Sequence, residues 1–195
     1  MAFSSIDTYR GPKVSRRELL LGAGALAATA AVPAQAFQLQ RSQVPGIDAG
    51  TLWVRLAGRD EQAHVRFRTP DGRLIDRGVQ ELSWAWRDWR DHDAFTWIDY
   101  RLFDCLALMQ TRATVASGRA VCLHLTSGYR TRERNATIPA AAKNSQHCEG
   151  RAGDLWLDGY RPSETARLAQ ACGAAGIGVY RNFTHVDVGG EGRRW

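Results

Sequence analysis

Alternating polar and apolar residues, or short apolar runs, mark five segments of the chain as β-strands with a buried face. The predicted strands are 51–57, 63–69, 121–126, 152–157 and 184–188. In the last of these, His185 and Asp187 fall on one face and Val186 and Val188 on the other. The turn Pro70-Asp71-Gly72 follows the second strand and joins it to Leu74 and Ile75, which predicts a hairpin.

Two further segments have apolar residues at helical spacing. The first helix, 99–117, is predicted from Leu102, Cys105, Leu106 and Met109, with Asp99 as its cap. The second helix, 163–175, has Pro162 and Ser163 at its start and Gly176 just past its end. Strands mixed with helices predict an α+β fold.

Two histidines and an aspartate have the spacing of a metal site. His147 and Asp154 are seven residues apart, and His185 follows on the last predicted strand. Imidazole nitrogen and carboxylate oxygen both suit zinc, and a catalytic zinc site uses three protein ligands. Gly150 lets the chain bend between His147 and Asp154. The alternative is that these residues only make hydrogen bonds within loops.

Several separated motifs, in this order, resemble the peptidase M15 superfamily, and in particular its exported branch called domain of unknown function 882. They are Ser127-Gly128-Tyr129-Arg130, Asn135, Ser145-x-His147-x-x-Gly150-Arg151-Ala152-x-Asp154 and His185-Val186-Asp187. The likeness also includes Arg87-Asp88-Trp89-Arg90, Gly176 to Tyr180, and Arg194-Trp195. That branch includes murein endopeptidases, which cut peptidoglycan cross-links. The resemblance implies a Hedgehog or D-Ala-D-Ala metallopeptidase fold, with helices flanking a small, mostly antiparallel sheet.

The resemblance also implies roles for single residues. His147, Asp154 and His185 match the zinc ligands of M15-like enzymes. Arg130 matches the arginine that grips a substrate carboxylate or carbonyl, a task that suits a planar guanidinium. Tyr129, from the same motif, is expected to contact the substrate, and so is Ser145, which alternatively serves as a turn residue.

The general base is less clearly marked. Asp187, two residues after the last ligand, is the nominee, and its alternative role is to orient a ligand. The better-known pattern has an acid three residues before the final histidine, where this chain has Asn182. Glu149 is a weaker candidate for the base.

The implied activity is metal-assisted hydrolysis of a peptide bond, with Arg130 offsetting the negative charge that develops on the carbonyl. Peptidoglycan peptides are the expected substrates. Endopeptidase activity is the leading expectation, and carboxypeptidase activity on the same peptides is its alternative. Two other classes stay open: a zinc-containing module that binds peptidoglycan without turnover, and an accessory envelope protein. The type of cross-link is also open.

The first residues have the features of an export signal. Ser15-Arg16-Arg17-Glu18-Leu19-Leu20 matches a twin-arginine signature, and the apolar run 21–32 precedes Ala34-Gln35-Ala36. We therefore predict a signal peptide at 1–36, a flexible leader at 37–50 and one domain at 51–195. The periplasm is the expected destination, with no stable membrane span after cleavage; an uncleaved anchor is the alternative.

Charge and cysteine content add two constraints. Residues 1–36 hold four basic and two acidic residues, so the formal charge of +6 becomes +4 for the remainder. A basic surface suits an anionic cell-wall polymer, whereas nucleic acid is not expected, because the arginines are scattered among acids. We expect a monomer. The four cysteines, Cys105, Cys122, Cys148 and Cys172, allow three disulfide pairings, and the sequence does not choose among them.

Overall fold

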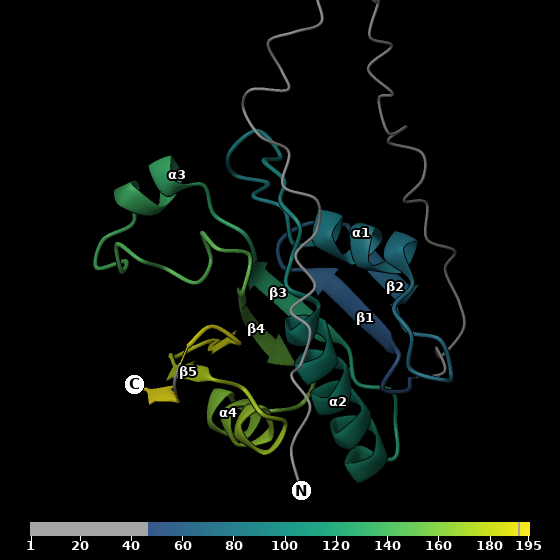
Figure 1. Ribbon diagram of the computed structural model, residues 1–195. Helices are drawn as coiled ribbons and strands as arrows, with labels where there is room; N and C mark the ends of the chain where they lie inside the picture. Colours follow the sequence, from purple (N-terminus) through teal and green to yellow (C-terminus); the bar gives the residue numbers. More distant parts are fainter. Residues whose placement is uncertain (1–46, 191) are drawn as a thin grey trace, which may run out of the picture. The chain divides into compact units, whose positions relative to one another are not determined.

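The computed structural model describes residues 47–190 and 192–195 (Figure 1). The predicted signal peptide and the predicted leader as far as residue 46 lie outside the described residues. Residues 47–50 end in a turn, where the side chain of Asp48 accepts a hydrogen bond from the amide of Gly50 and pairs with Arg66. Within the described part of the chain, none of the helices has both the length and the apolar character needed to span a bilayer.

Seven strands form one mixed sheet in the order β2-β1-β3-β4-β6-β5-β7. They are β1 (Thr51–Leu56), β2 (Gln62–Arg66), β3 (Leu123–Ser127), β4 (Ala152–Leu157), β5 (Gly176–Val179), β6 (Thr184–Asp187) and β7 (Arg193–Arg194). The pairs β1–β3 and β5–β7 are parallel, and the other four pairs are antiparallel. The predicted small, mostly antiparallel sheet is therefore corrected to a larger, mixed one, in which most pairs are nevertheless antiparallel. Alternation reveals a strand but not its neighbour, and the helices between β2 and β3 allow the chain to return parallel to β1.

The helices are α1 (Asp76–Ala85), α2 (Tyr100–Ser117), α3 (Arg132–Thr137) and α4 (Pro162–Ala171). The predicted first helix is confirmed as α2: the Asp99 carboxylate caps it by accepting from the amide of Arg101, and Gly118 ends it with a φ of 66°. The second predicted helix exists as α4, but its predicted end was wrong. The chain reverses at Gly173, whose φ is 86°, so that Gly176 opens β5.

One face of the sheet packs against helices. α2 and α4 contact each other and the strands, and they lie along the same part of the sheet in Figure 1. The side chains of Leu155 and Leu157 on β4 enter this core, and the fully buried ring of Trp86 meets Phe103 of α2 edge to face at 5.2 Å. Alternation along β4 therefore directs Asp154, which directly precedes Leu155, toward the other face.

That other face carries polar residues at matching positions. Asp154 of β4 is paired in register with His185 of β6. The chain between β3 and β4 contains α3, which extends beyond the strand ends and away from α2 and α4 (Figure 1). This connection returns His147 to the same face, where it meets Asp154 and His185.

Candidate metal centre

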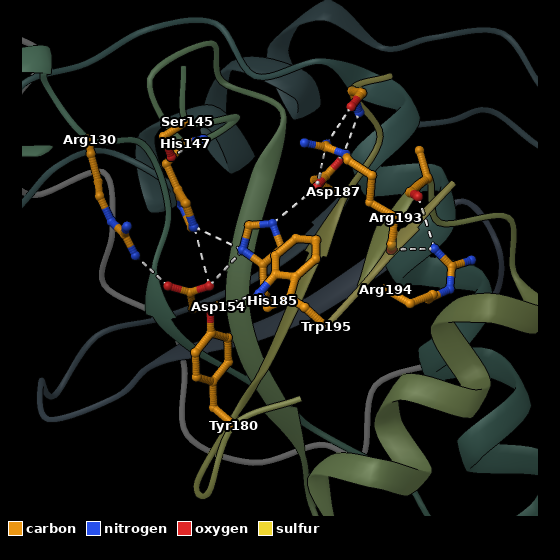
Figure 2. A network of polar contacts seen from close by, with 12 residues as sticks. Arg130, Ser145, His147, Asp154, Tyr180, His185, Asp187, Arg193, Arg194 and Trp195 are labelled. Carbon is orange, nitrogen blue, oxygen red and sulfur yellow. Dashed lines mark hydrogen bonds and ion pairs between the residues drawn. The ribbon is translucent and has the colours of Figure 1, made fainter. Parts of the chain in front are cut away.

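Three side chains converge at one point on the helix-free face of the sheet (Figure 2). The Nε2 atom of His147 lies 3.2 Å from Oδ1 of Asp154 and 3.1 Å from Nδ1 of His185. The third side of this triangle, from Nδ1 of His185 to Oδ1 of Asp154, is 2.9 Å. All three residues are buried. The structure thus brings together the three residues that the sequence predicted as ligands.

The outer hydrogen bonds of the two imidazoles fix which nitrogen faces the centre. Nδ1 of His147 lies 2.6 Å from the carbonyl oxygen of Gly128, which can only accept, so Nδ1 carries the hydrogen. Nε2 of His185 lies 3.1 Å from a carboxylate oxygen of Asp187 and donates to it in the same way. The inner nitrogens of both rings therefore present lone pairs, and Asp154 presents a third acceptor. Three acceptors at one point require a cation or a proton between them.

The donor set fits zinc. Bonds of about 2.0–2.2 Å in a tetrahedron place neighbouring ligand atoms roughly 3.3–3.6 Å apart, so the ligand atoms would need to separate by only a few tenths of an ångström to hold zinc. Two imidazole nitrogens and one carboxylate oxygen leave the fourth position for water or substrate. The outer partners Gly128 and Asp187 set the tautomers that a metal would need.

Local backbone features bring the ligands into place. A register shift between Leu125 and Ser127 at the end of β3 puts Ser127 opposite Asp154. Gly150 turns the chain between His147 and β4 with a φ of 65°, which confirms the predicted bend. A Cβ atom there would also lie 2.8 Å from the backbone oxygen of Trp97, so only glycine fits.

The charges in the cluster are strongly coupled. Burial alone would raise the pKa of Asp154, but the charges and hydrogen bonds of His147 and His185 hold it well below its usual range. Burial lowers the pKa of His147. Burial also acts to lower the pKa of His185, but the hydrogen bonds and charges of Asp154 and Asp187 outweigh it and raise the pKa. Asp154 is therefore ionised, as a ligand carboxylate must be.

Arg130 is held by the cluster itself. Its Nη2 pairs with the second carboxylate oxygen of Asp154, and its Nε donates to the hydroxyl of Ser127 at 2.9 Å. The guanidinium lines the cleft beside the ligands. Arg130 thus fixes the orientation of Asp154, a contact that the sequence did not predict.

Asp187 lies behind His185. It is fully buried and accepts from Nε2 of His185, from the amide of Gly189 at 3.0 Å, and from Nη2 of Arg193 at 3.1 Å (Figure 2). Burial acts to raise its pKa, but these contacts lower it. The carboxylate therefore touches the nitrogen of His185 that faces away from the centre, an arrangement that favours orientation of the ligand over proton transfer.

The two other positions considered for a general base, Asn182 and Glu149, do not line the cleft. Asn182, where the better-known pattern has an acid, lies exposed in the turn between β5 and β6. The exposed Glu149 pairs with Arg132 at 2.5 Å and does not line the cleft.

A cleft of about 340 Å³ opens over the three ligands. Ser145 lines it, and its hydroxyl accepts from the amide of His147 at 3.3 Å, so it serves the turn as well as the cleft. Tyr129 does not line the cleft: its ring packs against the hydrophobic core, and its amide donates to Trp86. A contact of Tyr129 with the substrate stays a prediction, and the structure places this residue beside the cleft-lining Arg130 with its amide anchored on Trp86.

The walls of the cleft contain residues that the sequence did not assign to a site. One wall is the segment 138–142, and the other is formed by Tyr180, Phe183 and Trp195. Only the resemblance had pointed at Tyr180 and Trp195. No local pattern predicts that residues so far apart as 140 and 195 border one cavity.

The cysteines form no disulfide among the described residues. Cys148 follows His147 directly but lies outside the ligand cluster. A second group, Cys122, His124 and Asp158, has metal-type side chains close together. There, however, Nε2 of His124 pairs with Asp158 at 2.7 Å, and burial raises the pKa of the Cys122 thiol to about 12, so the thiolate that zinc needs is disfavoured.

Comparison with known families agrees with this geometry. The model of one peptidase M15 family, described as peptidoglycan L,D-endopeptidase MepK, matches residues 47–195. No curated protein matches the chain at a significant level. The match takes in all three clustered side chains and both walls of the cleft. The chain therefore belongs to the MepK family of M15-type peptidoglycan endopeptidases.

Proposed function

We propose that this protein is a zinc-dependent peptidoglycan endopeptidase and that His147, Asp154 and His185 hold the zinc ion. The observation that carries the proposal is the convergence of three lone-pair donors, buried under a cleft, with both imidazoles locked by outer hydrogen bonds. Family membership supports a peptidoglycan substrate. The description of the family supports the L,D bond of diaminopimelate-to-diaminopimelate cross-links as the bond that is cut.

A zinc ion at this point would polarise the scissile carbonyl and lower the pKa of a bound water toward ~7. The side chains around it prepare the site. Arg130 holds Asp154 with one oxygen directed at the centre. Asp187 holds the tautomer of His185 and is itself held by Arg193, so we assign Asp187 to positioning and not to general-base catalysis.

A zinc-containing module without turnover is the second candidate. It is favoured by one observation: among the described residues that line the cleft, the carboxylates are Asp154 and Asp187, and both are engaged by partners. Such a module would bind cross-linked peptides and release them unchanged.

The decisive experiment compares metal-free and zinc-loaded protein on purified muropeptide dimers, with products followed by mass spectrometry. We expect zinc-dependent conversion of diaminopimelate-linked dimers to monomers, and slower conversion of D-alanine-linked dimers. His147→Ala should abolish conversion, whereas His124→Ala, which removes a histidine outside the cluster, should not. Zinc binding without conversion of either dimer would favour the binding module.

We also propose that the protein acts as a monomer in the periplasm after export through the twin-arginine pathway. The motif Arg16-Arg17 and the short apolar run after it support this route. Replacing both arginines with lysine should keep the protein in the cytoplasmic fraction. Equal periplasmic amounts of the two forms would contradict the route, and sedimentation of the exported form tests the monomer.

A further inference from the structure

Two aromatic side chains form the wall of the cleft beside His185. Tyr180 comes from the turn between β5 and β6, and Trp195 directly follows β7. Both are large apolar groups that stay open to solvent, with 44% and 53% of their surface exposed. Nε1 of Trp195 donates to the hydroxyl of Tyr180 at 2.9 Å, and Figure 2 shows the two side chains directed toward each other beside the ligands.

Trp195 is seated by the sheet edge. Its amide donates to Ile177 at 3.1 Å, and its carbonyl accepts from Val179 at 2.9 Å. The indole lies over Gly178, where a Cβ atom would come within 2.5 Å of Nε1. Its ring centre is 5.2 Å from that of His185, the residue that pairs with Gly178 in register. The indole nitrogen therefore lies next to Gly178, the residue of β5 that is paired with His185, and it holds the hydroxyl of Tyr180 there.

The hydroxyl of Tyr180 has a hydrogen to give. A phenol has one donor and two acceptor positions, and Trp195 uses an acceptor position. Within residues 47–190 and 192–195, no group accepts from this hydroxyl. The ring itself is fixed by stacking on Phe183, with centres 4.5 Å apart and planes 16° from parallel. The side chain is thus held in the wall of the cleft by a ring contact and a hydrogen bond.

Hydrolysis of an amide needs a donor at this place. Negative charge grows on the carbonyl oxygen as water adds, and preorganised donors aimed at that oxygen stabilise it. Arg130, which the sequence nominated for this task, is engaged with Asp154 and Ser127. Tyr180 is the side chain of the opposite wall that has an unused donor.

We propose that Tyr180 is a catalytic residue that donates a hydrogen bond to the scissile carbonyl oxygen in the transition state, and that Trp195 positions its hydroxyl. The inference rests on the proposed endopeptidase function and adds a residue to it. The tyrosine keeps its proton throughout, so the step requires no other reactant.

The first test is the kinetics of zinc-loaded Tyr180→Phe on the diaminopimelate-linked dimer. Loss of one oxyanion donor lowers kcat by roughly 100- to 1000-fold, and KM should stay within about threefold of the wild-type value. Tyr160→Phe is the matched control, because its hydroxyl also makes one hydrogen bond, to the backbone oxygen of Ala113 at 3.0 Å, and neither residue lines the cleft. Its kcat should equal that of the wild type.

Two variants test the positioning role of Trp195. Trp195→Phe keeps an aromatic ring but removes the indole donor, and Gly178→Ala keeps the donor but displaces the indole. Both should lower kcat more than they raise KM, by on the order of tenfold, and neither should add to the effect of Tyr180→Phe. Full additivity would show that Trp195 acts independently of Tyr180.

A binding measurement separates this inference from the proposed function. A phosphinate peptide, whose PO₂⁻ group replaces the scissile amide, mimics the charged transition state. Calorimetry should show that Tyr180→Phe binds it about 100-fold more weakly, while the affinity for the uncleaved peptide and the zinc content are unchanged. If wild-type protein lacks turnover, the proposed function fails and the inference fails with it; if wild-type protein turns over and Tyr180→Phe binds the phosphinate equally well, only the role of Tyr180 fails. Equal phosphinate affinity, or a loss confined to KM, would overturn the proposal.

Discussion

Replacement of Asp187 by asparagine separates the two roles that the sequence left open. Asp187→Asn keeps the size of the side chain and removes its charge. In the structure, that charge receives a hydrogen bond from His185 on one side and from Arg193 on the other. If Asp187 orients His185, the variant should bind zinc more weakly but retain chemistry once loaded. If Asp187 is the base, zinc affinity should persist while kcat collapses.

The magnitude follows from the contact. Loss of the carboxylate behind a metal-bound histidine lowers metal affinity by roughly 10- to 100-fold, which corresponds to about 1.4–2.7 kcal/mol. A hydrogen bond to a charged group contributes roughly 1.5–3 kcal/mol, which agrees with that range. Because Asp187 is fully buried and its partner Arg193 is partly exposed, water compensates Arg193 but not the imidazole, so we expect the upper half of the range.

The assay is competition for zinc with a chromophoric chelator, followed by kcat at saturating zinc. Asp158→Asn is the control, because its carboxylate holds His124 at 2.7 Å in a similar histidine–aspartate pair outside the cluster. Control and wild type should bind zinc equally. Wild-type zinc affinity in Asp187→Asn, together with a loss of kcat beyond about 100-fold, would refute the positioning role.

Three further outcomes follow from the structure. Burial acts to lower the pKa of His185, but Asp154 and Asp187 outweigh it and raise the pKa, so a proton competes with zinc as the pH falls through the raised pKa. Apparent zinc affinity should then fall about tenfold per pH unit, and a flat profile from pH 8 to 5 would contradict this. Gly128→Ala places a Cβ atom 2.3 Å from a backbone oxygen, and urea unfolding of the metal-free variant should show about 1–3 kcal/mol of destabilisation; an unchanged midpoint would count against the close approach. Burial raises the pKa of Cys105 and Cys122 to about 12, so a thiol reagent at pH 8 should label them only after unfolding, when four thiols per chain react.

The strands were predictable where alternation and burial agree. Residues 152–157 were predicted as a strand and form β4 with those bounds. The pairing of strands was not predictable, because the partner of a strand depends on contacts far along the chain. The mixed sheet and the register that sets Asp154 against His185 therefore appear only in the structure.

Helix α1 was not predicted, because its sequence carries only weak helix signals. Its sequence contains Gly78, which disfavours a helix, and its N-cap is Ile75, which offers no side-chain hydrogen bond. The glycine is required by packing, since a Cβ atom there would lie 2.2 Å from the backbone oxygen of Arg66 on β2. The tertiary contact between α1 and β2 outweighs the weak propensity.

The site prediction divides in a similar way. Ligand chemistry and spacing nominated His147, Asp154 and His185, and the resemblance joined them into one set. The partners of these residues were not predictable, because hydrogen bonds such as that from His147 to the carbonyl of Gly128 involve backbone atoms that carry no sequence signal. Similarly, nothing in the sequence alone places Arg130 on Asp154.

The edge strand β7 supports the ligand His185 through residues that are not ligands themselves. Within the described part of the chain, β7 pairs with β5 alone and contains two residues, yet Arg193 in it holds Asp187, and Trp195 after it lies against the ring of His185. Short edge segments open with less free energy than the whole domain. Partial opening of β7 would remove Arg193 from Asp187 and Trp195 from His185 without displacing the three ligand residues. The three ligands would stay together, but the ring of His185 would be oriented less precisely. The geometry of the metal centre is thus coupled to the docking of β7, and substitutions that loosen this strand should weaken metal binding without unfolding the core.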